Sequence, residues 1–233
     1  FKLLSFIRKN QSSRSSFLQV RFSSTIRSMF SITTVTQPSL DTQHPLLLLQ
    51  SSHGEKYMFG KVTEGAQRAL TENKIRISKL ENIFLTGELN WSSLGGLPGM
   101  ILTIADQGKD KLVLNYGSEL IKYVVSTWRY FVFRFGISLD TNVSGQYKDK
   151  LITVNTINIK SGVTKPNQIM GKSSFGEKEQ KLLNSIVSNM FPKLTPTHRY
   201  EPSSDPYLNV DLPNVNNIDY ESICYEICFN PIR

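Results

Sequence analysis

Histidine, cysteine and long apolar runs are scarce in this sequence of 233 residues. The three histidines, His44, His53 and His198, stand apart and form no paired motif, whereas zinc sites draw on closely grouped His, Cys and carboxylate side chains. Two cysteines, Cys224 and Cys228, are too few for a disulfide framework and suit a reducing compartment. No apolar run approaches the roughly 20 residues that span a bilayer, so membrane insertion is not expected.

Acidic residues are absent from the first 30 positions. This stretch is rich in serine and carries six of the 27 basic residues, namely Lys2, Arg8, Lys9, Arg14, Arg21 and Arg27. An arginine-rich, serine-rich and acid-free amino terminus is typical of a mitochondrial transit peptide. Residues 1–29 are therefore interpreted as a mitochondrial leader, and the alternative is a basic tail that contacts RNA without specificity. Translation from Met29 would give a second, nuclear or cytosolic form without the leader.

The rest of the chain is nearly neutral. Beyond residue 30, the remaining 21 basic residues face 19 acidic ones, so most of the net charge of +8 comes from the leader. Proteins that bind nucleic acid through its backbone normally carry a broad basic surface. Such a surface is not indicated for the folded part.

Hydrophobic periodicity predicts alternating strands and helices over residues 30–233, which we treat as one domain. Strands are expected at 30–36, 45–50, 57–60, 79–86, 112–115, 151–160 and 223–229, with a turn at 53–54. Helices are expected at 64–72, 100–105, 118–133 and 177–190, the first with Thr63 and the third with Ser118 as N-cap. Five prolines mark 191–217 as a surface connection. The alternation indicates an α/β fold class in which sheets and helices form layers.

The most informative pattern lies at residues 83–99. The apolar strand Ile83-Phe84-Leu85 leads into a loop, and Gly96-Leu97-Pro98-Gly99 begins the next helix. This arrangement resembles the metallo-β-lactamase superfamily, in which the loop carries a His-x-His-x-Asp-His signature and the tRNase Z proteins add Gly-Leu-Pro-Gly. Upstream, Glu64-Gly65-Ala66-Gln67-Arg68 resembles a second tRNase Z segment, and residues 126–135 resemble the fungal long forms in particular.

The resemblance implies a zinc-dependent tRNA 3′-processing endoribonuclease, but the loop lacks the ligands of the signature. Two zinc ions require a dense set of imidazoles and carboxylates. The corresponding positions are occupied by Gly87, Glu88, Leu89, Asn90, Trp91, Ser92 and Ser93, of which Glu88 alone has a zinc-binding side chain. We interpret 87–93 as a degenerate metal loop, and we expect no catalytic residue and no metal ligand in this chain.

In long-form tRNase Z proteins the amino-terminal half has the fold without the metals, and the carboxyl-terminal half carries zinc and catalysis. The resemblance therefore implies an amino-terminal half that serves as a scaffold and as a platform for the tRNA substrate. The carboxyl half of the full-length protein, which lies outside this sequence, would remove the 3′ trailer of precursor tRNA. The implied fold is an αββα sandwich, degenerate and truncated at its carboxyl-terminal end. The alternative is a stand-alone, metal-free interaction module of the same fold, imported into mitochondria.

The two motifs are expected to maintain structure. The residues concerned are Glu64, Gly65, Gln67, Arg68, Gly96, Leu97, Pro98 and Gly99. Glycine relieves backbone restrictions where a strand turns into a helix, and proline presets φ at a helix start. We therefore interpret Gly96 and Gly99 as turn residues and Leu97 as part of the core.

Three further patterns have weaker functional interpretations. Gly171-Lys172-Ser173 resembles the end of a phosphate-binding loop, but Pro166 stands where that motif has a glycine, and a nucleotide-binding enzyme that uses Lys172 would need a different fold. Cys224 and Cys228 lack a second pair of ligands, and strand alternation places them with Glu226 on the less apolar face. The aromatic cluster favours a helical core face over stacking on RNA bases; it comprises Trp128, Tyr130, Phe131, Phe133 and Phe135.

Overall fold

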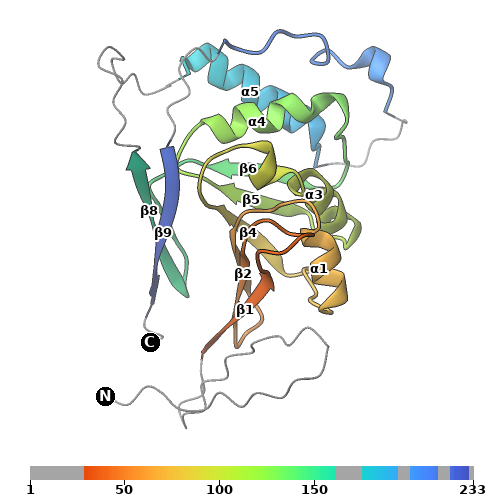
Figure 1. Ribbon diagram of the computed structural model, residues 1–233. Helices are drawn as coiled ribbons and strands as arrows, with labels where there is room; N and C mark the ends of the chain where they lie inside the picture. The colour runs from red at the N-terminus through yellow and green to blue at the C-terminus, as the bar shows by residue number, and fades with distance from the viewer. Residues whose placement is uncertain (1–28, 161–174, 194–199, 215–220, 231–233) are drawn as a thin grey trace, which may run out of the picture.

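The computed structural model describes residues 29–160, 175–193, 200–214 and 221–230. The predicted leader up to residue 28, the Gly171-Lys172-Ser173 pattern, His198 and parts of the proline-rich connection lie outside these ranges. The described residues form three layers, which are a layer of helices, a six-stranded sheet and a three-stranded sheet (Figure 1). No helix in this part of the chain is long and apolar enough to cross a membrane.

The six-stranded sheet keeps its strands in chain order. It comprises β1 (Phe30–Thr36), β2 (Leu46–Ser51), β3 (Lys56–Gly60), β4 (Leu80–Leu85), β5 (Lys111–Asn115) and β6 (Ser138–Asn142). The first two pairings are antiparallel, whereas β3 to β6 run parallel to one another. The carboxyl ends of β3 to β6 therefore meet at one edge of the sheet, and their amino ends meet at the opposite edge.

Parallel neighbours need a crossover connection between them. Helices α1 (Ala66–Glu72), α3 (Leu97–Asp106) and α4 (Leu120–Thr127) lie in these crossovers. Together with α5 (Glu177–Met190) they cover one face of the sheet (Figure 1). The sheet thus separates a helical side from a side that faces the second sheet.

Side-chain alternation along the central strands fills both sides of the sheet. In β3, Met58 belongs to the core under the helices, whereas Tyr57 and Phe59 belong to the core between the sheets. In β4, Ile83 faces the helices and Phe84 faces the second sheet. Successive strand residues point to opposite faces, so the near-continuous apolar runs of β3 and β4 are what a sheet buried on both faces requires.

The second sheet is antiparallel and packs on the face away from the helices. It comprises β7 (Gln146–Lys148), β8 (Ile152–Lys160) and β9 (Glu221–Phe229) in that order. Tyr225 meets the ring of Phe84 edge-on, with 5.4 Å between the ring centroids. On the opposite face of β9, Cys224 and Cys228 are exposed, which confirms the predicted alternation of this strand.

The predicted helix at 118–133 is too long. Helix α4 ends at Thr127, a 3-10 turn follows at Trp128–Tyr130, and the N-cap is Glu119 rather than Ser118. Trp128 is buried, but Tyr130 and Phe131 are each 61% exposed, so the prediction of a common aromatic core face is wrong for them. The helical pattern fails there because the chain leaves the helix to enter β6.

Strands β6 and β7 were not expected from the sequence. They are short and mostly polar, with the sequences SLDTN and QYK, so they lack the apolar alternation that identifies a strand. The predicted N-cap of α1 is also wrong, because Gly65 occupies that position with φ +84° in place of Thr63. The other predicted helices and strands are confirmed within two residues or less at most of their ends.

Arg129 attaches the proline-rich connection to the helical layer. Its side chain is buried, with the residue 8% exposed, and its guanidinium donates to the carbonyl oxygens of Tyr207 at 3.1 Å and Val210 at 3.0 Å. It also donates to the hydroxyl of Tyr130 at 2.7 Å. Hydrogen bonds that involve a charged group are stronger than neutral ones, so one arginine holds a segment about 80 residues downstream.

Candidate functional site

The loop that the sequence analysis singled out follows β4 at the carboxyl edge of the parallel strands. Gly87 adopts φ +76° and pairs with Ile223 of β9, with N–O distances of 2.8 and 3.2 Å. The hydroxyl of Tyr116 donates to the carbonyl oxygen of Gly87 at 3.0 Å. The start of the loop is therefore tied to the second sheet by main-chain hydrogen bonds and to Tyr116, which follows β5, by a side-chain hydrogen bond.

Polar side chains in the rest of the loop cap a short helix. Helix α2 (Trp91–Leu94) has Asn90 as its N-cap, and the Asn90 side chain accepts from the backbone N–H of Ser93 at 2.9 Å. The hydroxyl of Ser92 donates to the same oxygen at 2.7 Å. A side-chain oxygen at this position satisfies one of the free N–H groups of the first turn. Asn90, Ser92 and Ser93 of the 87–93 loop thus bond to one another.

A lysine from the preceding segment lies against this loop. A Cβ placed on Gly87 would be 2.7 Å from Cε of Lys61 and 3.3 Å from its Nζ. An ammonium group this close to Gly87 would repel a metal cation bound in the loop, because both carry positive charge. Lys61 was not singled out in the sequence, since nothing in the pattern of residues 87–93 indicates which side chain packs on them.

The donor set of the loop does not fit a zinc site. Glu88 is exposed and Leu89 packs on the core. Within the residues that the structure describes, no three His, Cys, Asp or Glu side chains are grouped closely enough to hold a metal ion. His44 and His53, which lie in the described part, belong to other segments.

The two motifs upstream and downstream of the loop contact each other. Trp91 donates from its indole N–H to the Glu64 carboxylate at 3.2 Å. Gln67 donates to the hydroxyl of Thr103 at 2.6 Å, and a Cβ on Gly99 would lie 2.8 Å from the Gln67 side-chain oxygen. Arg68 instead forms an exposed ion pair with Glu72 at 2.7 Å. The motif residues thus join α1, α2 and α3.

The glycines of the second motif serve a different purpose from the one expected. Gly96 has φ −85°, which any residue adopts, and Gly99 lies inside α3. A Cβ on Gly96 would lie 2.1 Å from the carbonyl oxygen of Thr63. Close approach of α3 to the 62–67 segment, rather than a left-handed backbone, excludes a side chain here. Leu97 is buried as expected, and Pro98 is buried as well.

Tyr225 of β9 connects the second sheet to the carboxyl ends of two strands of the first sheet. Its hydroxyl donates to the carbonyl oxygens of Leu85 at 3.1 Å and Asn115 at 2.8 Å, the last residues of β4 and β5. Burial raises the pKa of Tyr225 well above its usual value, and the neighbouring Tyr116 raises it further. The hydroxyl therefore keeps its proton and serves as a structural donor. Neither tyrosine had a signal in the sequence.

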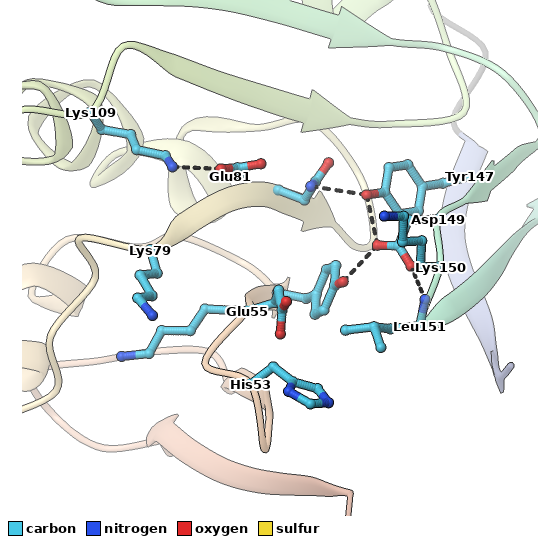
Figure 2. A pocket seen from close by; sticks show the side chains of 12 residues that line it. His53, Glu55, Lys79, Glu81, Lys109, Tyr147, Asp149, Lys150 and Leu151 are labelled. Atoms are coloured by element: carbon cyan, nitrogen blue, oxygen red, sulfur yellow. Dashed lines mark hydrogen bonds and ion pairs between the residues drawn. The ribbon is translucent and has the colours of Figure 1, made fainter. Parts of the chain in front are cut away.

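A second polar region lies at the opposite edge of the sheet, where β3, β4 and β5 begin. Here the turn before β3, the start of β4, the segment before β5 and the loop between β7 and β8 enclose a cavity of about 480 Å³ (Figure 2). We call it the amino-edge pocket. Its lining includes Lys56, Lys79, Lys109 and Lys150, and its polar acceptors are Glu55, Glu81 and Asp149.

On the side of the amino-edge pocket formed by the second sheet, Asp149 is the centre of a hydrogen-bond network. Its carboxylate accepts from the hydroxyls of Tyr57 at 2.6 Å and Tyr147 at 3.0 Å, and from the backbone N–H groups of Leu151 and Ile152. Burial raises the pKa of both tyrosines, and the Asp149 carboxylate raises them further. Tyr57 and Tyr147 therefore remain neutral donors, and the bond from Tyr57 of β3 ties the 149–152 turn to the first sheet.

Comparison with known proteins shows what this chain is similar to. Residues 33–96 match the family described as tRNase Z endonuclease. The chain is 58% identical to Ribonuclease Z of Saccharomyces cerevisiae over 212 residues, which cover 88% of this chain and 24% of that protein. It is 38% identical to the human zinc phosphodiesterase ELAC protein 2 over 112 residues, which cover 47% of this chain and 13% of that protein.

A solved structure agrees with the sequence relatives. The crystal structure of a long-form RNase Z from yeast superposes with a TM-score of 0.80 at 56% identity, over 88% of this chain and 27% of that chain. The layered α/β architecture is thus that of a metallo-β-lactamase-like domain. The chain is related to the long-form tRNase Z proteins, as the sequence motifs predicted, and it spans about a quarter of the length of the yeast relative.

Proposed function

We propose that this chain belongs to the amino-terminal half of a tRNA 3′-processing endoribonuclease, which serves as its non-catalytic scaffold and substrate platform. The observation that carries the proposal is the metal loop: the chain has 58% identity to a ribonuclease Z, yet its 87–93 loop caps a helix instead of presenting ligands. The partner would be a carboxyl-terminal half of the same chain. Together the two halves would remove the 3′ trailer from precursor tRNA.

Zinc belongs, in this proposal, to the carboxyl-terminal half alone. The human relative is named a zinc phosphodiesterase, but Gly87, Asn90 and Ser93 offer no ligand of the kind that zinc requires. The ammonium group of Lys61 beside Gly87 also opposes a bound cation. No catalytic step is therefore assigned to a residue of this chain.

Elemental analysis and a cleavage assay test the proposal together. We expect the purified 233-residue chain, with folding checked by its melting curve, to carry no zinc and to leave precursor tRNA uncut. The full-length gene product should carry zinc and remove the 3′ trailer. Stoichiometric zinc in the folded chain, accompanied by cleavage, would show that the loop still forms a site.

A second candidate function is a stand-alone, metal-free interaction module of the same fold. The loop chemistry is compatible with both functions, because a capped helix at residues 90–94 needs no catalytic partner. The reading frame downstream of the Arg233 codon separates them. A His-x-His-x-Asp-His motif within the next several hundred codons supports the endoribonuclease, and a stop codon without that motif supports the module.

We further propose a mitochondrial location, with a nuclear or cytosolic form that starts at Met29. The support is the composition of residues 1–28, which are rich in arginine and serine and contain no acidic residue. Residues 1–28 should carry a fused reporter into mitochondria, and replacement of Arg8, Arg14 and Arg21 by Glu should abolish import. Equal import of the protein that starts at Met29 would contradict the proposal.

A further inference from the structure

Three cationic residues lie together where β3 and β4 begin. The two strands are parallel, and Lys56, the first residue of β3, lies opposite Leu80, the first residue of β4. Lys79 directly precedes Leu80, and the Lys56 ammonium donates to the carbonyl oxygen of Arg76 in the same segment. The pairing of β3 with β4 therefore brings Lys56 next to cationic residues that lie 20 or more positions downstream.

The carboxylates of the amino-edge pocket interact with other groups. Glu81 forms an ion pair with Lys109 at 2.6 Å (Figure 2), and Asp149 accepts from two tyrosine hydroxyls and two backbone N–H groups. Glu55 accepts from a serine hydroxyl. Carboxylates are charged at neutral pH, but within the described chain none of these lies within ion-pair distance of the Lys56 ammonium.

This environment favours the neutral amine form of Lys56. Burial is the largest cause of the lowered pKa of Lys56, and the charges of Lys79 and Arg76 lower it further. A lysine beside another cationic group gives up its proton more readily, and its neutral amine is a nucleophile. An ammonium group has three N–H donors. After the loss of one proton, the amine can therefore still donate to the Arg76 carbonyl oxygen while its lone pair is free.

The fold leaves Lys56 accessible and packs Lys79 on the adjacent turn. Lys56 is partly buried and lines the amino-edge pocket, a cavity of about 480 Å³. Gly54, in the turn before β3, has φ +95°, and a Cβ on it would lie 3.0 Å from Nζ of Lys79. A small reagent can therefore approach Lys56 while the Lys79 ammonium stays close to the start of β3.

We propose that Lys56 is a modification site that takes an acyl group from short-chain acyl thioesters. The neutral amine attacks the carbonyl carbon of the thioester, a C–N bond forms, and the C–S bond breaks. The thiolate leaves, and the proton that the nitrogen loses goes to the thiolate. The tetrahedral intermediate carries negative charge on oxygen, which a neighbouring cation such as the Lys79 ammonium stabilises. The product is an uncharged amide in place of one cation of the cluster.

Lys56 differs from the other lysines that line the pocket. Lys109 is paired with Glu81 at 2.6 Å, and Lys79 and Lys150 are exposed, so that water solvates their ammonium groups. Of the four, Lys56 is the one that is partly buried and has no carboxylate partner in the described chain. We therefore expect acylation to be selective for Lys56. This inference does not depend on the role in tRNA processing proposed above.

Mass spectrometry of the full-length gene product after incubation with S-acetyl-N-acetylcysteamine, a small acetyl thioester, tests the proposal. Near neutral pH, the initial rate of acetylation at Lys56 should be at least about fivefold higher than at Lys178, an exposed lysine of α5 between two glutamates. After unfolding in urea the two rates should become similar, because Lys79 and Arg76 approach Lys56 through the pairing of β3 with β4. The rate at Lys56 should also level off at a lower pH in the folded protein than in the unfolded one, since burial and the two cations lower its pKa.

Substitution of Lys79 separates the effect of the neighbouring charge from that of exposure. Lys79→Gln should lower the rate of acetylation at Lys56 at least about threefold, whereas Lys79→Arg, which keeps the charge, should leave the rate within about twofold of the parent value. Lys178→Gln is the matched control and should not change the rate at Lys56. Because Lys79 and Lys178 are exposed, all three variants should melt like the parent protein.

Three outcomes overturn the proposal. The first is that Lys56 reacts no faster than Lys178 in the folded protein. The second is that the preference for Lys56 survives in urea, which would assign it to the local sequence instead of the fold. The third is that the rate at Lys56 is unchanged in Lys79→Gln, which would exclude the neighbouring cation as the cause. None of these outcomes concerns zinc or tRNA cleavage, so the proposed function is judged separately.

Discussion

The two edges of the six-stranded sheet differ in how their polar groups are used. At the carboxyl edge, the Asn90 side chain accepts from the Ser93 N–H and the Ser92 hydroxyl of α2, and Tyr116 and Tyr225 donate to main-chain carbonyls. At the amino edge, lysines line an open cavity and several lack an ion pair in the described chain. The edge that carries the 87–93 loop is therefore occupied by structural bonds, whereas at the opposite edge four lysines and three carboxylates line a cavity.

A loop without metal ligands still needs partners for its N–H and C=O groups, because unpaired buried groups are costly. Gly87 pairs with Ile223, and Asn90 caps α2. The carboxyl edge should accordingly respond to substitution through stability.

The largest effect on the carboxyl edge is expected from Leu97→Ala. Leu97 is fully buried at the start of α3, and removal of a large aliphatic side chain from a core costs about 2–5 kcal/mol. Urea unfolding of the full-length gene product measures the loss. Leu47→Ala is the matched control, since Leu47 is 39% exposed and should lose clearly less. Equal losses would mean that the start of α3 does not stabilise this edge.

Gly96→Ala is expected to have the next largest effect. The new Cβ would lie 2.1 Å from the carbonyl oxygen of Thr63, and backbone atoms must move to relieve the clash. Overpacking of this kind typically costs about 1–3 kcal/mol. Gly145→Ala is the control, because nothing lies within 4 Å of its Cβ position. A Gly96→Ala protein that unfolds at the same urea concentration as the control would contradict the close approach of α3 to residues 62–67.

Asn90→Ala should have a smaller effect. Loss of an N-cap side chain costs about 0.5–2 kcal/mol, and Asn90 accepts from the Ser93 N–H at 2.9 Å. Asn90→Asp keeps the acceptor and should restore most of the stability. If the aspartate variant is as unstable as the alanine variant in the same unfolding assay, the side chain does not stabilise the loop by capping α2.

Much of the fold follows from the sequence where apolar alternation is strong. The runs at Leu46–Ser51, Lys56–Gly60 and Leu80–Leu85 alternate between two cores, and each was predicted as a strand. Strands β6 and β7 were not predicted, because their side chains lack apolar alternation. Their extended form depends on pairing with β5 and β8. The end of α4 at Thr127 was missed for a related reason, since Phe133 beyond it stacks on Tyr200, which is distant in the chain.

The degenerate loop could be located from the sequence, but its present contacts could not. Gly-Leu-Pro-Gly fixed the position of the loop, and the missing histidines indicated the loss of metal. The approach of Lys61 and Tyr225 depends on how the two sheets meet, which no local pattern encodes. The amino-edge pocket was missed for the same reason, because its lysines lie on four segments between residues 53 and 151.

Glu88→Ala should have the smallest effect, and it decides whether the comparison of the two edges holds. Glu88 is the one side chain of the 87–93 loop with a zinc-binding group, but it is exposed and stands next to Gly87, against which Lys61 packs. Surface substitutions usually change stability by no more than about 0.5 kcal/mol, so the melting curve should not move. If this half is non-catalytic, kcat/KM for precursor tRNA should also stay within about threefold. A variant that melts normally but loses a hundredfold in kcat/KM, equivalent to about 2.7 kcal/mol of transition-state stabilisation, would mean that the carboxyl edge still takes part in the reaction.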